Sequence, residues 1–367
     1  MTPIKAALLK KIRRLNQGYF PRYMLTPPQW LVLGVNNLCN LHCKMCDVGT
    51  QNKETIFATN LTGTTPKHMP IALFEKIVLQ SAKYFPDTKL GYAFTEPLIY
   101  KHLEDSLALT RKHKLYTTIT TNALNLAQKA EVICENRVAE LYISLDGPEE
   151  IHNHIRGHSR AFAKAMAGLE KLFSFPVRPE VSVYCVISRW NIGRLTALAD
   201  FFRQYPITRL GFMHTNFTPK SVAFEHNLKY GPRYFASHSN IELTQIEAMD
   251  LKLLWQELKQ LKANNYPFDV CVSPELEDEP ALTRFYHAPH EFIGRQCKDV
   301  FTNMMIKSDG SAIPAHGRCF NLNLGNLYQD NLKALWNGQV YARLRQDLHR
   351  AGGLFPACSR CCSGFAK

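Results

Sequence analysis

The sequence predicts an α/β fold, a partial (β/α)6 barrel of the TIM type followed by a small cysteine-rich C-terminal extension. Three observations support this prediction. Short apolar, β-rich runs alternate with helical stretches, most of the eleven cysteines gather near the two ends of the chain, and 46% of the 367 residues are hydrophobic. A chain of this size and composition can bury a large core. Regular alternation of strand and helix indicates parallel strands joined by crossover helices.

Six runs have the composition of buried strands, and the stretches between them have helical periodicity. The predicted strands are Trp30–Asn36, Leu90–Phe94, Tyr116–Thr121, Glu140–Leu145, Val181–Ser188 and Arg209–His214. The predicted helices cover residues 71–85, 100–113, 126–137, 160–173 and 191–204. Six units are two short of a closed barrel. We therefore expect an open barrel whose working residues lie in the loops after the strands.

The alternation stops after the sixth strand. A loop-like stretch from Thr218 to Asn240 precedes a helix that is predicted to start at the capping-box pair Thr244 and Glu247 and to end near Lys262. Further along, the sequence predicts a short apolar run at Phe268–Val272, a helix over 279–288, a hairpin at Ser308–Ser311 and a helix over 330–347. We divide the chain into an N-terminal segment and linker (1–29), the barrel (30–216), a helical connector (217–294) and the extension (295–367).

The N-terminal segment is strongly basic. Apolar residues recur at helical spacing between lysines and arginines, so residues 4–15 are predicted to form a short amphipathic helix. Two roles remain open for this helix, packing against the body of the protein and peripheral contact with an anionic membrane. Tyr19 to Pro28 contains three prolines and is predicted to be a linker.

Charge and cysteine content narrow the class of protein. No apolar run approaches the ~18–20 residues that span a bilayer, and the N-terminus lacks the pattern of a secretory signal, which predicts a cytoplasmic protein. In the reducing cytosol, clustered cysteines are more often metal ligands than disulfides. The formal charge of +13 is concentrated near the N-terminus. Metal-bound thiolates carry negative charge that offsets part of this positive charge. The excess of positive charge therefore does not by itself indicate a nucleic-acid partner.

The first cysteine group directly follows the first predicted strand. Cys39, Cys43 and Cys46 lie within eight residues, in a loop where a barrel presents its chemistry. Structural zinc and ferredoxin-type sites usually take four protein ligands. Three cysteines therefore favour an iron–sulfur site with one iron open to another ligand, and a zinc site completed by His42 is the less favoured alternative.

This Cys-x3-Cys-x2-Cys segment, in this position, resembles the radical S-adenosylmethionine (radical SAM) superfamily, and the resemblance spans most of the chain. It implies that Cys39, Cys43 and Cys46 hold a [4Fe–4S] cluster whose fourth iron binds S-adenosylmethionine (SAM). In that family, an electron from a low-potential donor such as flavodoxin or ferredoxin cleaves SAM. The resulting 5′-deoxyadenosyl radical then abstracts hydrogen from a substrate.

Further residues match the family at the strand ends. Phe94-Thr95-Glu96-Pro97 stands where the family has Gly-Gly-Glu-Pro. The resemblance implies that Glu96, together with the Thr95 hydroxyl, binds the methionine part of SAM. Asn122 belongs to a segment that resembles the family's Thr-Asn-Gly motif, with Ala123 in place of the glycine.

The fourth and fifth strands end in further candidates for cofactor binding. Ser144 and Arg156 form one expected set by resemblance, because family members often place an arginine near the cofactor carboxylate. Asp146 belongs to the same set or caps the following turn. Asn191 after the fifth strand is similarly placed, with helix capping as the alternative role.

The second cysteine group lies in the C-terminal extension. Cys297, Cys319, Cys358 and Cys361 supply four thiolates, and the segment resembles the SPASM and shorter twitch extensions of radical SAM enzymes. A full SPASM extension uses about seven cysteines for two clusters, whereas this tail has five, and Ala315 stands where a cysteine usually falls. One auxiliary [4Fe–4S] cluster is therefore expected, with a zinc ribbon as the alternative and Cys362 as an alternative ligand to Cys361.

The remaining candidates are weaker. Cys134, Cys185 and Cys271 are predicted to be buried small hydrophobes, although a radical epimerase would need a thiol such as Cys185 or Cys271 to return hydrogen. Position alone places a further group on the substrate side, namely His214, Asn216, His226 and Tyr230.

We therefore expect a radical SAM enzyme that acts on a small-molecule, sugar or lipid-linked substrate. A peptide or protein maturase that forms crosslinks or epimers is the alternative within the superfamily. The alternative outside it is a zinc-containing protein that binds nucleic acid, which predicts affinity that falls steeply with salt.

Overall fold

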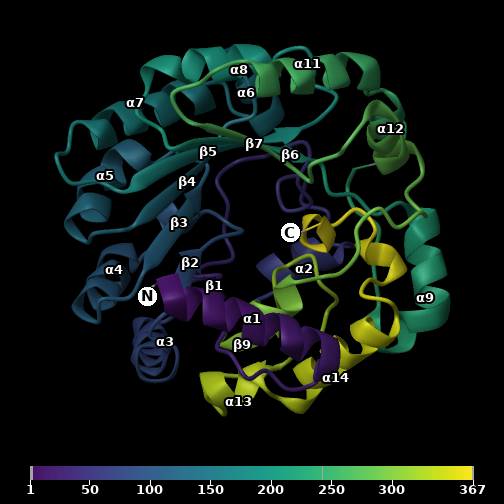
Figure 1. Cartoon of the computed structure of the whole chain (residues 1–367). Helices are drawn as coiled ribbons and strands as arrows, with labels where there is room; N and C mark the ends of the chain where they lie inside the picture. Colours follow the sequence, from purple (N-terminus) through teal and green to yellow (C-terminus); the bar gives the residue numbers. More distant parts are fainter. Residues whose placement is uncertain (1–2, 242, 366–367) are drawn as a thin grey trace.

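A computed structural model describes residues 3–241 and 243–365 (Figure 1). One continuous sheet runs in the order β10-β9-β8-β1-β2-β3-β4-β5-β6-β7. Its strands are β1 (Trp30–Leu33), β2 (Lys89–Tyr92), β3 (Thr117–Thr121), β4 (Glu140–Ser144), β5 (Glu180–Ile187), β6 (Arg209–His214), β7 (Asp269–Ser273), β8 (Asn303–Ile306), β9 (Ser311–Pro314) and β10 (Gly325–Asn326). The strands from β1 to β7 pair in parallel, so the predicted α/β fold with an open barrel is confirmed.

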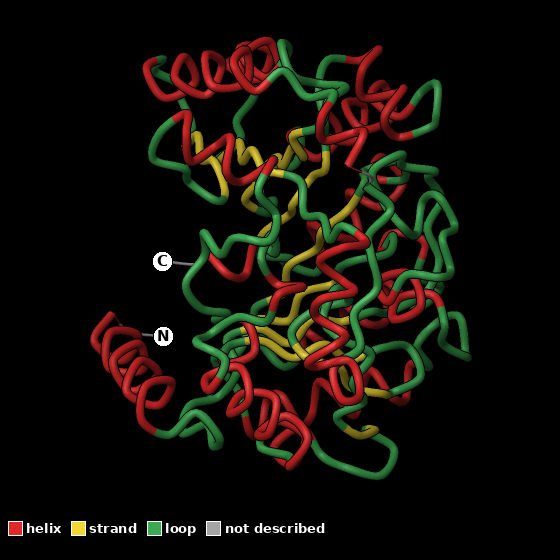
Figure 2. Tube along the Cα trace, turned by 90° about the vertical axis from the view of Figure 1, so that its right-hand side faces the viewer, coloured by secondary structure: helices red, strands yellow, loops and turns green. Residues whose placement is uncertain are grey.

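Helices surround the curved sheet, as the end-on and side views show (Figures 1 and 2). Those of the barrel are α2 (Ile56–Thr62), α3 (Ile71–Tyr84), α4 (Leu103–Lys112), α5 (Leu126–Glu135), α6 (Glu149–Arg156), α7 (Ala161–Phe173) and α8 (Leu195–Phe201), with short 3-10 turns η1 (Pro97–Ile99) and η2 (Phe202–Gln204). Leu31, Leu33 and Leu90 are fully buried. Because parallel strands are covered on both faces, most of them carry apolar residues at successive positions, whereas the largely buried β3 has four threonines among its five residues.

The remaining helices come before the first strand or after the sixth strand in the chain. They are α1 (Pro3–Tyr19), α9 (Lys220–Tyr234), α10 (Leu243–Glu247), α11 (Leu251–Ala263), α12 (Glu279–His287), α13 (Leu332–Trp336) and α14 (Gln339–Arg350), with η3 (Asp299–Phe301), η4 (Pro356–Cys358) and η5 (Cys362–Phe365). Within the described residues, no helix is both long enough and apolar enough to cross a membrane.

The connector differs from the sequence expectation in three places. The stretch predicted to be loop-like contains α9, which buries Val222 and Ala223 although Pro232 lies in its last turn. The predicted capping box does not start the following helix, because α11 begins after Asp250, whose carboxylate accepts the main-chain N–H of Leu253. The apolar run at 268–272 forms β7, a seventh parallel strand beside β6.

The C-terminal extension continues the same sheet. β8 pairs in parallel with β1, and β9 returns antiparallel to β8 through the predicted hairpin, in which Gly310 has φ +80°. The predicted helix over 330–347 is two helices, since Asn331 caps α13 and α14 starts after Gly338. This arrangement brings the end of the chain inside the ring of helices in Figure 1.

Candidate functional site

The cysteine loop after β1 is fixed to the C-terminal end of α6. The main-chain N–H groups of His42 and Lys44 donate to the carbonyls of Arg156 (3.3 Å) and Ile155 (2.9 Å). Gly157 follows with φ +65°, and a Cβ there would lie 2.7 Å from the His42 carbonyl oxygen. Only glycine permits this close approach, so the end of α6 determines where the cysteines lie.

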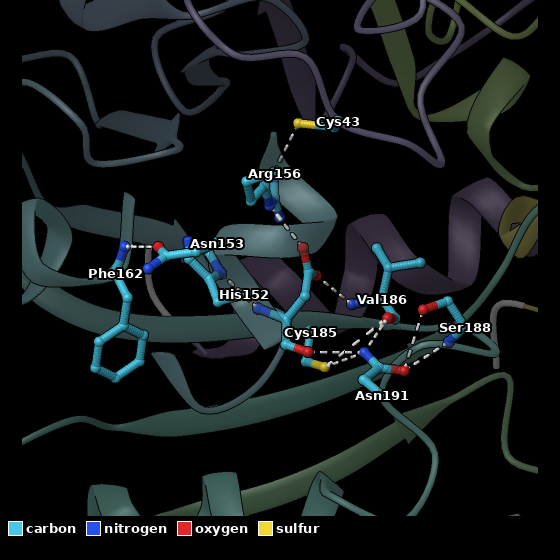
Figure 3. Close-up of polar contacts among 10 residues, drawn as sticks. Cys43, His152, Asn153, Arg156, Phe162, Cys185, Val186, Ser188 and Asn191 are labelled. Carbon is cyan, nitrogen blue, oxygen red and sulfur yellow. Dashed lines mark hydrogen bonds and ion pairs between the residues drawn. The ribbon is translucent and has the colours of Figure 1, made fainter. Parts of the chain in front are cut away.

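Arg156 connects the cysteine loop to a buried carboxylate (Figure 3). Its Nε donates to Oδ2 of Asp146 at 2.6 Å, and its NH1 lies 3.7 Å from Sγ of Cys43. Burial by itself would lower the pKa of Arg156, but Asp146 and the Cys43 thiol raise it, so the guanidinium stays charged. In this arrangement Arg156 stabilises negative charge on a cysteine that is predicted to bind iron.

Asp146 does not cap the following turn. Its second oxygen, Oδ1, accepts the main-chain N–H of Val186 at 3.0 Å, and its own N–H donates to Nδ1 of His152 at 3.1 Å. The side chain is completely buried. Asp146 therefore joins the ends of β4 and β5 to α6, and the alternative role as a turn cap is wrong.

Asn191 works at the same strand ends rather than as a helix cap. Its amide nitrogen donates to the carbonyls of Asp146 and Val186, both at 2.8 Å, and its oxygen accepts the N–H of Ser188. α8 begins four residues later, at Leu195. Ser144 ends β4 in a half-buried position on the same side.

Glu96 joins the ends of β2 and β3. Oε1 accepts bonds from the Thr121 hydroxyl (2.6 Å) and the Leu98 N–H (3.0 Å), while Oε2 accepts the N–H of Asn122 (2.8 Å). Burial raises the pKa of this carboxyl, and these three bonds act against that rise. A carboxylate oxygen can accept two bonds, so Oε2 can also accept a donor from a ligand.

Thr95 and Asn122 face the cysteine loop from the same strand ends. The Thr95 hydroxyl donates to the carbonyl of Asn36 at 2.9 Å. The amide of Asn122 donates to Oδ1 of Asn40 at 2.8 Å, one residue after Cys39. The structure thus brings together the candidates from the ends of β2, β3 and β4 around the loop that carries the first cysteine group.

Phe94 and Ala123 stand where the corresponding family motifs have glycine, and both residues adopt the positive φ angles that glycine favours. Phe94 has φ +83° and Ala123 has φ +62°, in the region that side chains disfavour. The ring of Phe94 packs against Phe57 (6.2 Å between centroids) and His316 (5.9 Å). The missing glycine was visible in the sequence, but the contact of Phe94 with the C-terminal extension was not.

A pocket beside the C-terminal cysteine group reaches Asp47, the residue after Cys46, and its volume of about 780 Å³ includes solvent at its open mouth. Asp47 and Phe57 line it from the segment after Cys46, and all four predicted auxiliary ligands line it from the extension, namely Cys297, Cys319, Cys358 and Cys361. Residues 216–218 and 236–239 complete the wall. The pocket is partly open to solvent, so its lining residues rather than its volume indicate what it can bind.

Four residues were predicted to line the substrate side from their place in the sequence. Of these, Asn216 lines the pocket, whereas His214, His226 and Tyr230 do not. His214 is buried against the hydroxyl of Tyr286 at 2.8 Å, and burial lowers its pKa to about 3. His226 bonds the carbonyl of Tyr234, while Tyr230 packs on Phe355. These side chains fill the core because β6 and α9 turn them away from the mouth.

Three charged pocket residues were missed by sequence reasoning, namely Asp47, Arg318 and Arg360. Asp47 is buried and accepts the N–H of Asn240 at 2.6 Å. Arg318 stacks over the ring of Phe57 at 4.3 Å. Burial raises the pKa of Asp47, and the positive charge of Arg318 opposes that rise. The position of Asp47 directly after Cys46 was the available indication.

The chemistry of the C-terminal donor set fits an iron–sulfur cluster. Burial, and then the charges of neighbouring groups that include Cys319 and Cys358, raise the pKa of Cys297. Four such thiolates repel one another, and iron cations offset that repulsion. Within residues 3–241 and 243–365, no three His, Cys, Asp or Glu side chains converge enough to hold a single metal ion.

The thiols of the last two cysteines contact each other, and this contact is the largest cause that raises the pKa of Cys362, but their other partners differ. Cys361 lines the pocket with its thiol 3.9 Å from Nε2 of His316. The sulfur of Cys362 instead accepts a hydrogen bond from Nδ2 of Asn216 at 3.7 Å, and the main-chain N–H of Cys362 donates to Oδ1 of Asn216 at 3.0 Å. This geometry supports Cys361 as the cluster ligand. Cys185 is completely buried, as expected of a small hydrophobe, and neither it nor Cys271 lines the pocket.

Comparison with known proteins matches these two regions separately. Residues 34–202 match the family model of the radical SAM superfamily, and residues 297–362 match the SPASM iron–sulfur cluster-binding domain. The Fe-coproporphyrin III synthase of Methanosarcina barkeri is 25% identical over 253 residues, which cover 69% of this chain and 57% of that protein. The chain thus aligns with little more than half of this curated relative.

Solved structures share the fold. SuiB of Streptococcus suis, in a complex with SAM, has a TM-score of 0.61 and 16% identity, covering 98% of this chain and 78% of SuiB. The enzyme anSMEcpe, bound to SAM and a peptide, has a TM-score of 0.59 and 18% identity, covering 91% of this chain and 86% of its own. The radical SAM domain implies a [4Fe–4S] cluster that binds SAM, and the SPASM domain implies further iron–sulfur binding. The chain belongs to the radical SAM superfamily of enzymes and carries a SPASM extension.

Proposed function

We propose that this enzyme cleaves SAM reductively at the Cys39, Cys43 and Cys46 site and oxidises a substrate held in the pocket beside the C-terminal cysteine group. The cluster supplies the electron for this cleavage, and the 5′-deoxyadenosyl radical that results removes a hydrogen atom from the substrate. The observation that carries the proposal is the pocket itself, because Asp47, the residue after Cys46, and all four C-terminal thiols line it together.

The chain's own residues have separate tasks in this proposal. Glu96 and Asn122 orient the methionine end of SAM from the ends of β2 and β3, with Thr95 and Ser144 beside them. Arg156, held by Asp146, stabilises negative charge at Cys43 through its 3.7 Å contact. Asn191 keeps the ends of β4 and β5 in register. We assign Arg156, Asp146 and Asn191 to positioning the site rather than to direct contact with SAM.

The extension is proposed to hold one auxiliary [4Fe–4S] cluster through Cys297, Cys319, Cys358 and Cys361. With four thiolate ligands, substrate has no open iron to bind there, so electron transfer is the favoured role. A low-potential donor such as flavodoxin or ferredoxin supplies the first electron. All eleven cysteines are free thiols, which suits the reducing cytoplasm where such donors work.

The substrate is proposed to be a small molecule, sugar or lipid-linked compound. Asp47 and Arg318 offer opposite charges to it, and the rings of Phe57, Phe217 and Phe320 offer apolar contact. The relative from Methanosarcina barkeri is named for a porphyrin product, whereas SuiB has been solved with a precursor peptide. A peptide substrate is therefore the alternative within the same chemistry.

Anaerobic reconstitution tests the proposal. The wild-type protein should bind about eight irons, four at each site, and should form 5′-deoxyadenosine from SAM when reduced. Replacing Cys39, Cys43 and Cys46 together with alanine should halve the iron and abolish 5′-deoxyadenosine. Cys134→Ala, which alters a thiol in α5, is the matched control and should change neither result. Retention of 5′-deoxyadenosine formation by the triple variant would sink the assignment.

A further inference from the structure

The N-terminal helix α1 packs with its polar side inward and its apolar side outward. Leu8, Leu15 and Tyr19 lie on one stripe of the helix and are 56%, 50% and 75% exposed. On the opposite side, Asn16 is 1% exposed and Arg13 is 8% exposed. This is the reverse of what an amphipathic helix on a protein core shows.

Hydrogen bonds fix this orientation. The amide nitrogen of Asn16 donates to the carbonyls of Phe20 and Tyr23, both at 2.6 Å, and its oxygen accepts the N–H of Leu25 at 2.7 Å. Arg13 donates to the carbonyl of Pro27 at 3.2 Å. The inner polar face therefore satisfies the backbone of the following linker, and rotating the apolar stripe inward would break these bonds.

The exposed apolar surface continues beyond the helix. Phe20, Tyr23 and Leu25 are 67%, 54% and 66% exposed in the linker. Together with Leu8, Leu15 and Tyr19 they form what we call the α1 apolar face. The sequence-based helix ended at residue 15 and had no aromatic residue, whereas the observed helix extends to Tyr19 and gains one. Figure 2 shows α1 at the edge of the molecule.

Positive charge borders the α1 apolar face. Lys10, Lys11, Arg14 and Arg22 are exposed, and no acidic residue occurs before Asp47. A second copy of the chain docking face to face would bring like charges together, which disfavours self-association. An apolar stripe with aromatic residues and a cationic border matches the interface of an anionic bilayer, where rings and aliphatic chains enter the acyl boundary and cations bind phosphate.

We propose that the α1 apolar face docks this protein on an anionic lipid membrane surface. α1 lines a pocket together with Pro28, Gln29 and Thr302, which precede β1 and β8, so it lies at the amino-terminal edge of the sheet. The cysteine loop leaves the opposite, carboxyl edge. Docking through α1 therefore tethers the protein while leaving the mouth of the barrel open, and it does not depend on the proposed reaction.

Vesicle sedimentation of the full-length protein tests this docking. Wild-type protein should sediment with vesicles that contain phosphatidylglycerol and much less with pure phosphatidylcholine, and added salt should weaken the binding. Replacing Leu8, Leu15 and Tyr19 together with serine should lower the affinity for the anionic vesicles at least about tenfold. These positions are exposed, so the melting temperature should stay near the wild-type value.

A matched control uses other exposed apolar residues. Phe224 and Leu228 on α9 are 65% and 72% exposed, and α9 lies at the right of Figure 1, away from α1. Phe224→Ser with Leu228→Ser should leave vesicle binding unchanged. Absence of wild-type binding to anionic vesicles, or equal losses in the two variants, would overturn the proposal. So would dimerisation in solution that the triple serine variant abolishes, because the face would then bind a second copy.

Discussion

The carboxylate of Asp146 binds the guanidinium of Arg156 at 2.6 Å in a place where Asp146 has no exposure and Arg156 has little. The same guanidinium reaches the sulfur of Cys43. Removing one partner of such a buried ion pair destabilises the fold, because the other partner is left as an uncompensated buried charge. Here that charge would lie beside a cluster ligand, so the pair connects stability with the chemistry of the site.

Asp146→Asn should therefore be strongly destabilising. It leaves Arg156 buried without its anion, at a cost of about 3–5 kcal/mol of the free energy of unfolding. Asp269→Asn is the matched control, because Asp269 pairs with Arg209 at 3.5 Å with a largely exposed side chain. That pair should contribute at most about 1 kcal/mol. Urea unfolding under anaerobic conditions measures both, and similar losses would contradict a special role for the buried pair.

His214 should make stability depend on pH. Burial lowers its pKa to about 3, whereas an unfolded histidine titrates near ~6.5. Below that value the unfolded chain binds a proton that the folded protein does not. The free energy of unfolding should therefore fall on acidification, by up to about 1.4 kcal/mol per pH unit from this group.

Urea unfolding at several pH values below neutral checks this expectation. His214→Phe should reduce the pH dependence of the free energy of unfolding by the contribution of one titrating group. This reduction is expected whatever the substitution does to stability at neutral pH. His287→Phe, which changes an exposed histidine next to Tyr286, is the comparison variant. An identical slope in the wild type and His214→Phe would show that His214 is not kept neutral by the fold.

Glu96→Ala should weaken SAM binding while leaving iron content intact. The loss expected for one hydrogen bond to a charged group is ~1.5–3 kcal/mol, which equals roughly a tenfold to 150-fold increase in Kd. Glu140→Ala is the control, since Glu140 begins β4 at the far end of the strands and pairs with Lys89. Calorimetric titration with SAM distinguishes the two, and an unchanged Kd for Glu96→Ala would remove it from the cofactor site.

Cys319→Ala should remove the auxiliary cluster and separate its two possible roles. If the cluster transfers electrons, the variant still cleaves SAM but forms no oxidised product. If the cluster only holds the extension in place, the melting temperature falls and both activities disappear. We expect the first outcome, because abstraction of hydrogen in an oxidative reaction leaves one electron to be passed on.

Cys362→Ala provides the matched control for the same experiment. Its thiol contacts Asn216 rather than lining the pocket, so the variant should keep about eight irons. Loss of about four irons in Cys362→Ala, with full iron in Cys361→Ala, would exchange the two assignments. Iron analysis and the visible spectrum after reconstitution give the answer directly.

The sequence by itself determined the parts of this protein that depend on local order. Runs of apolar and β-branched residues indicated the parallel strands, since a strand covered on both faces favours such side chains at successive positions. The spacing of Cys39, Cys43 and Cys46 is a property of one short loop, and the family match to residues 34–202 agrees with it. Helix boundaries were less predictable, as α9 and α11 show, because tertiary packing and a single cap at Asp250 set them.

Only the tertiary structure decided which side chains meet. Asp146 and Arg156 looked like cofactor ligands from their positions, but their mutual contact and the 3.7 Å approach to Cys43 require α6 to pack on the cysteine loop. Asp47 and Arg318 share a pocket although they are far apart in the chain. The orientation of α1 could not be predicted from the sequence either. An amphipathic pattern shows that a helix has a polar and an apolar face, but it does not show which face packs against the protein. That choice depends on partners such as the linker carbonyls that Asn16 binds, which come together only when the whole chain has folded.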